Sequence, residues 1–129
     1  MRAALLILLG LAIGVIGTSQ VMNALAARNP MPKAVMHTLG YHAGELKRAV
    51  KSQQCDVAKI RQHLLRLQST ATDIVPTFGI AEPGFSDDAN KLQTALQQAV
   101  AAAPATCAAL TTALKPVGEA CQDCHQKYR

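Results

Sequence analysis

The last nine residues of the chain carry the pattern that decides its fold, Cys121-Gln122-Asp123-Cys124-His125-Gln126-Lys127-Tyr128-Arg129. On a helix, residues three and four positions apart share a face, so Cys121, Cys124 and His125 converge on one side. Cys-x-x-Cys-His is the attachment pattern of a c-type haem, in which the thiols form thioethers and the imidazole binds iron axially. The stretch therefore predicts one covalent haem c, attached through Cys121 and Cys124, with His125 as the proximal iron ligand.

Two other uses of a Cys-x-x-Cys pair fit the rest of the chain poorly. A structural zinc site needs a second ligand pair at similar spacing, but Cys55 and Cys107 are isolated. His37, His42 and His63 form no second short-spaced ligand motif either. A thioredoxin-like dithiol lies near a βαβ pattern, and the sequence has no strand-like pattern.

Four apolar stripes with helical spacing follow a break at Asn29-Pro30-Met31-Pro32. They run through residues 35–50, 57–74, 89–100 and 110–117, with a loop rich in proline and glycine after the second. Four amphipathic helices with short connections predict an all-α, antiparallel four-helix bundle over residues 28–129.

Several residues fit the ends of these helices. Asp56 is expected to cap the second helix and Thr106 the fourth, while Ser86 or Asp87 opens the third. Pro116 is expected to kink the fourth helix or interrupt its hydrogen bonding.

The two remaining cysteines fall in connections of this bundle. In an up-down-up-down arrangement the first and third connections lie at the same end, and Cys55 and Cys107 occupy them. In an oxidising compartment this predicts a disulfide between them. The alternative is two unrelated buried thiols.

The N-terminal segment predicts a membrane anchor. Residues 3–21 are apolar except for Thr18, Ser19 and Gln20, and nineteen helical residues span roughly 29 Å, close to a bilayer's hydrocarbon core. With Arg2 on the cytoplasmic side, residues 1–27 are expected to cross a bacterial inner membrane once and to hold the haem domain in the periplasm. A cleaved signal peptide is the alternative, since Ala24-Leu25-Ala26 fits a cleavage site.

Charge is distributed unevenly over the chain, whose net charge is +5. Residues 28–66 contain eight basic and two acidic residues, whereas residues 67–129 contain four basic and six acidic ones. The basic half would dock an acidic protein or anionic lipid headgroups, or it is simply a solvated face.

The ordering of these features resembles cytochrome c′ and its low-spin, methionine-ligated relatives over residues 31–129. The closing stretch 117–129, with its Tyr-Arg pair, looks like that family's haem motif. The loop pieces 78–79 and 83–87 are similar to its second connection, with Phe85 where many members have tryptophan. Residues 33–44 look like the methionine-bearing first helix of the low-spin branch, although the N-terminal segment departs from the family's usual pattern. The resemblance implies Met36 as the distal iron ligand and Arg129 near the haem.

The helical wheel independently favours Met36. At about 100° per residue, Met36 lies roughly 60° from the centre of its helix's apolar stripe, and His37 about 160° away. His42 borders the stripe and is the next candidate ligand. An ordinary core methionine and an open iron site remain alternatives.

These observations together predict a membrane-anchored c-type cytochrome that carries single electrons on the periplasmic side. Its expected partners are a membrane redox complex, such as a respiratory one, other electron carriers, and the bilayer through residues 3–21. A homodimer is a further expectation, and nucleic acid is not expected as a partner. The alternative functions are a five-coordinate haem module that binds NO or CO, and an accessory subunit whose haem is a folding core. The sequence contains no phosphate-binding loop or nucleophile–base pair, so we expect no enzyme activity.

Overall fold

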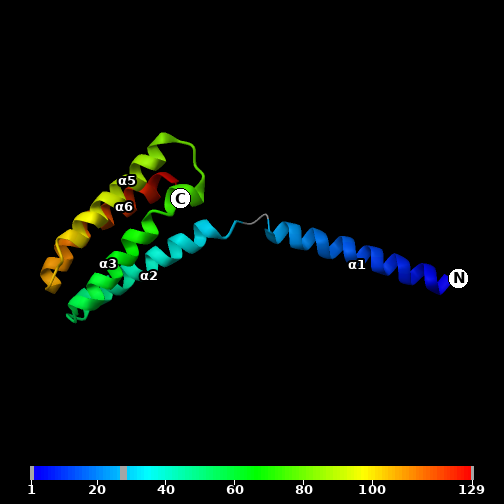
Figure 1. Ribbon diagram of the computed structural model, residues 1–129, viewed down its shortest axis with the longest axis horizontal. Helices are drawn as coiled ribbons and strands as arrows, with labels where there is room; N and C mark the ends of the chain where they lie inside the picture. Colours follow the sequence, from blue (N-terminus) through cyan, green and yellow to red (C-terminus); the bar gives the residue numbers. More distant parts are fainter. Residues whose placement is uncertain (1, 27–28, 129) are drawn as a thin grey trace. The chain divides into compact units, whose positions relative to one another are not determined.

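The computed structural model describes residues 2–26 and 29–128, and within these ranges its regular secondary structure is helical, with no strand (Figure 1). The six helices are α1 (Arg2–Ala26), α2 (Met31–Lys51), α3 (Val57–Ala71), α4 (Ile74–Phe78), α5 (Pro83–Ala101) and α6 (Cys107–Tyr128). The all-α prediction is therefore confirmed. The chain divides into two compact units, residues 1–30 and residues 31–129.

The first unit contains α1, which was expected to cross the membrane. Of the helices in the described ranges, none combines the length and the apolar character that a membrane span requires. The predicted single-pass localisation in the inner membrane is therefore wrong. The count of nineteen apolar residues included Thr18, Ser19 and Gln20. Without them the uninterrupted stretch is residues 3–17, about 22 Å of helix against a hydrocarbon core of about 30 Å.

The second unit is built on four long helices, each with one apolar stripe. α2 packs on α3, α3 on α5, α5 on α6, and α6 back on α2. Figure 1 shows α2 and α3 side by side, and α5 beside α6. The largest fully buried side chains lie where the stripes meet; they are Leu46, Ile60, Leu64, Phe85, Leu96 and Leu110. Full burial of one such side chain stabilises the fold by about 1.5–3 kcal/mol.

The helix ends follow from a few side chains. Asp56 caps α3, because its carboxylate accepts a hydrogen bond from the Lys59 amide at 2.8 Å. The Thr106 hydroxyl likewise accepts from the Ala109 amide at 3.2 Å. α5 begins at Pro83 rather than at Ser86 or Asp87, since the fixed φ of proline suits the first turn of a helix. α6 continues through Pro116.

The predicted second helix ends at Ala71, and a separate short helix, α4, contains Ile74 and the first residues of the segment that the sequence predicted as a loop. Ile74, its first residue, is only 2% exposed. Gly79 ends it in the left-handed conformation, with φ of 62°, which glycine adopts without a steric penalty. The burial of Ile74 thus holds α4 against the core.

A disulfide between Cys55 and Cys107 ties the α2–α3 connection to the first residue of α6. The two Cα atoms are 5.4 Å apart, and the cysteines are separated by 52 positions in the sequence. Closing a loop of this length restricts the unfolded chain and stabilises the native state by about 4 kcal/mol in the chain-entropy description.

Candidate haem site

The second unit contains a cavity of about 340 Å³ with largely apolar walls. It receives side chains from all five helices of the unit. Leu67 of α3 and Ile74 of α4 contribute to the walls, as do Leu39, Ala89, Leu92, Leu96, Leu114 and Val117 from the remaining helices.

The three residues of the haem motif line this cavity from the last turns of α6. Cys121, Cys124 and His125 all border it; the two cysteines are half-buried and His125 is exposed. Unlike Cys55 and Cys107, Cys121 and Cys124 are not joined to each other. Burial is the first cause that raises the pKa of both thiols. A raised pKa favours the neutral thiol, which distinguishes the pair from a reactive redox dithiol, whose pKa is lowered.

Three glycines make room in the same cavity. Gly40 and Gly44 lie one turn apart on α2, and Gly118 lies on α6. A Cβ atom added at any of them would meet no other heavy atom within 4 Å. Glycine within a helix costs about 0.5–1 kcal/mol relative to alanine, so these positions keep space open at a cost in helix stability. Apolar walls, cleared space and a Cys-x-x-Cys-His edge together fit a flat, covalently held haem.

Met36 lines the cavity from α2 and is half-buried against the core, whereas its neighbour His37 is exposed. The structure therefore brings Met36 and His125 to the same cavity from two different helices. His42, the next candidate ligand, does not line it. Arg129, expected near the haem, lies outside the described residues.

Two charged side chains also border the cavity, Lys47 from α2 and Asp88 from α5. Asp88 is 3% exposed and is the one buried charged residue in the described part of the chain. Its carboxylate accepts hydrogen bonds from Lys127 Nζ at 2.7 Å and from Lys91 Nζ at 2.9 Å. These bonds, that from Lys127 foremost, lower the pKa of Asp88, which is thus a buried carboxylate anion.

The sequence analysis did not identify Asp88 as a site residue. The only local signal is its spacing from Lys91, three positions on, and the Lys127 partner lies 39 positions away.

The final aromatic residue of the motif anchors the end of α6. The Tyr128 ring meets Phe85 edge to face, with ring centroids 5.2 Å apart, and Phe85 in turn contacts Phe78. A Cβ atom at Gly84 would lie 3.0 Å from the Tyr128 hydroxyl oxygen, so glycine there permits this close approach. These contacts hold the turn that carries Cys124 and His125 against the start of α5.

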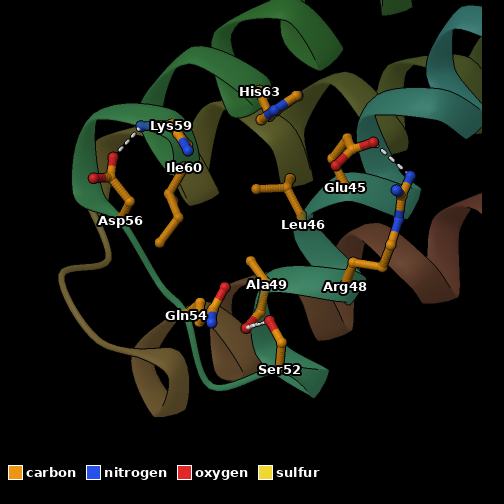
Figure 2. Close-up of a pocket in the computed structure, with 10 residues that line it drawn as sticks. All are labelled: Glu45, Leu46, Arg48, Ala49, Ser52, Gln54, Asp56, Lys59, Ile60 and His63. Carbon is orange, nitrogen blue, oxygen red and sulfur yellow. Dashed lines mark hydrogen bonds and ion pairs between the residues drawn. The ribbon is translucent and has the colours of Figure 1, made fainter.

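His42 instead pairs with His63 across α2 and α3, with the two Nδ1 atoms 2.8 Å apart. The Tyr41 ring packs edge-on against both imidazoles. His63 also borders a second cavity of about 230 Å³, formed by the end of α2 and the start of α3 (Figure 2). Figure 2 shows that polar residues lining this cavity already interact with one another: Glu45 pairs with Arg48, and Asp56 accepts a hydrogen bond from the Lys59 amide.

This pair predicts a pH-dependent stability. Burial, followed by the charge of His63, lowers the pKa of His42 from its ordinary 6.5. The unfolded chain then binds the His42 proton more tightly than the folded one, so the stabilisation is full well above pH 6.5 and is lost as the pH falls through 6.5 and below. We expect the free energy of unfolding, from urea titrations, to fall between about pH 7.5 and about pH 5.

The substitution His42→Asn should flatten that decrease, whereas His37→Asn, at an exposed position on the same helix, should preserve it. An equal pH dependence in the wild type and in His42→Asn would refute the assignment to this pair.

Comparison with known families finds a match for the C-terminal part of the second unit. Residues 80–129, which contain α5 and α6 with the Cys-x-x-Cys-His motif, match the family model described as Cytochrome C'. No curated protein and no solved structure matches the chain. The chain is thus similar to that family over these residues, which make up less than half of its length. Met36 on α2 lies outside the matched residues, so the match does not extend to the low-spin branch.

Proposed function

We propose that this chain is a cytochrome with a single covalent haem c that carries one electron at a time. In this proposal α2, α3, α5 and α6 form an antiparallel four-helix bundle around the haem. Cys121 and Cys124 hold it by thioethers, His125 binds the iron on one side, and Met36 binds it on the other. The observation that carries the proposal is that Met36 and His125, from different helices, line one apolar cavity.

The haem, when bound, supplies an iron that cycles between the ferric and ferrous states. The residues of the chain decide how that iron is used. If His125 and Met36 both held the iron, an external molecule would find no free place on it, which would favour electron transfer over gas binding. A thioether sulfur also raises the potential relative to a second imidazole. The apolar walls would keep water from the haem, and Gly40 and Gly44 of α2 would leave room for it beside the helix.

The surface charge suggests the kind of redox partner. Lys47 borders the cavity, and Arg48 and Lys51 follow it on the exposed end of α2. A cationic surface next to the haem would steer an acidic electron carrier or redox complex towards it. We also propose that the chain can pair with a second copy of itself. The disulfide is consistent with an oxidising compartment. We propose no enzymatic activity for the chain.

A second candidate is a gas-binding haem module, and one observation favours it. Met36 is only partly buried, and the glycines beside it leave open space on α2. If the sulfur stays off the iron, that space admits a molecule the size of NO or CO.

A redox titration tests the electron-carrier proposal. The purified protein is titrated by spectroelectrochemistry and followed by its absorption. We expect one reversible transition that fits a one-electron Nernst curve, in which a tenfold change in the ratio of ferric to ferrous protein takes 59 mV. The ferrous form should transfer its electron to an acidic carrier faster than to a basic one, with a rate that falls as salt rises. Absence of a reversible transition would count against the proposal.

A further inference from the structure

We infer that Asp88 is the residue through which the polypeptide lowers the reduction potential of the haem. The inference rests on the proposed haem c function and deepens it, since it names a positioning and tuning group for that same cavity. Asp88 touches the cavity but is not an iron ligand in the proposal.

The location of Asp88 gives its charge access to the iron. It lines the cavity together with Cys124 and His125, and its carboxylate is bonded at 2.7 Å to Lys127, two positions after His125. A charge acts more strongly across a low-dielectric interior than across water.

The two countercharges are placed differently from the carboxylate. The Asp88 side chain is 3% exposed, whereas the Lys91 and Lys127 side chains are 65% and 54% exposed. Water and salt therefore screen the lysines much more than they screen Asp88. Asp88 is one anion against two cations, but its electrostatic effect on the haem iron would be screened less than the effects of the two lysines.

This arrangement has a definite sign. Ferric haem carries one more positive charge than ferrous haem, so a buried anion beside it stabilises the ferric form and lowers the potential. Lys127 opposes this effect from the other side of the same ion pair. Removing Asp88 and removing Lys127 should therefore shift the potential in opposite directions. Loosening of the structure predicts another pattern, because both substitutions break the same 2.7 Å contact between α5 and α6.

The experiment compares midpoint potentials of the full-length, haem-loaded chain in the wild type, Asp88→Asn, Lys127→Gln and Asp87→Asn. Asp88→Asn keeps the shape and removes the buried charge, and Asp87→Asn removes a neighbouring charge that is exposed. We expect the potential to rise in Asp88→Asn, to fall in Lys127→Gln, and to change much less in Asp87→Asn. The haem content of each variant is measured in parallel from its pyridine haemochrome spectrum.

The outcomes separate the possible failures. Shifts of the same sign in Asp88→Asn and Lys127→Gln, or a shift in Asp88→Asn no larger than that in Asp87→Asn, would overturn the inference while leaving the haem function intact. If Asp88→Asn fails to fold, Lys127→Gln decides alone, and an unchanged or raised potential rejects the inference. A wild-type chain without covalent haem would reject the proposed function, and the inference with it.

Discussion

Replacing Cys121 and Cys124 together by serine is expected to reduce the covalent haem content from one per chain to none. Both thiols line the apolar cavity beside His125, and serine has no sulfur with which to form a thioether. The variant is expected to lose its haem on extraction with acidified organic solvent, whereas the wild type retains it. Pyridine haemochrome spectra of the extracted polypeptides measure the difference.

The chain offers a matched control in its other two cysteines. Cys55→Ser combined with Cys107→Ser also removes two thiols, but these form the disulfide at the end of the unit. That variant should retain one covalent haem and lose up to about 4 kcal/mol of unfolding free energy. Covalent haem in the Cys121/Cys124 variant, or equal loss in both variants, would contradict the assignment of the site.

Met36→Ala is expected to convert low-spin iron to high-spin iron and to open the distal position. Met36 is the side chain of α2 that borders the cavity with a sulfur atom, and alanine cannot replace that ligand. CO has to displace the bound sulfur in the wild type, so we expect its affinity to rise by about 100-fold in the variant, which corresponds to about 2.8 kcal/mol. Absorption spectra and CO titrations of the ferrous protein measure both effects.

Met31→Ala provides the control for this substitution. Met31 is on the same helix but is 52% exposed, and it does not line the cavity. Its spectra and CO affinity should match the wild type. A Met36→Ala spectrum indistinguishable from that of Met31→Ala would show that the sulfur of Met36 is not on the iron.

The parts of the site that the sequence predicted depend on local spacing. Cys121, Cys124 and His125 share a helix face by their three- and four-residue spacing, and α6 does carry all three to one cavity. The stripe of α2 similarly distinguished Met36, which lines the cavity, from the exposed His37. The Asp56 and Thr106 caps were also predictable, because each hydrogen bond spans only three residues.

The parts that the sequence did not predict depend on contacts between distant residues. Asp88 is a charged residue on an apolar face, and its burial makes sense only with Lys127, 39 positions away. The His42–His63 contact likewise joins residues 21 positions apart on two helices. The prediction of a membrane anchor was wrong for a local reason, because the count of apolar residues included Thr18, Ser19 and Gln20, which end the apolar stretch.

The most direct test of the account is the absorption spectrum of the ferrous wild-type protein before and after exposure to CO. If Met36 and His125 both bind the iron, the spectrum should be low-spin and should not change under CO at concentrations that saturate an open haem. A high-spin spectrum that shifts fully on exposure to CO would contradict the electron-carrier account and would favour the gas-binding one.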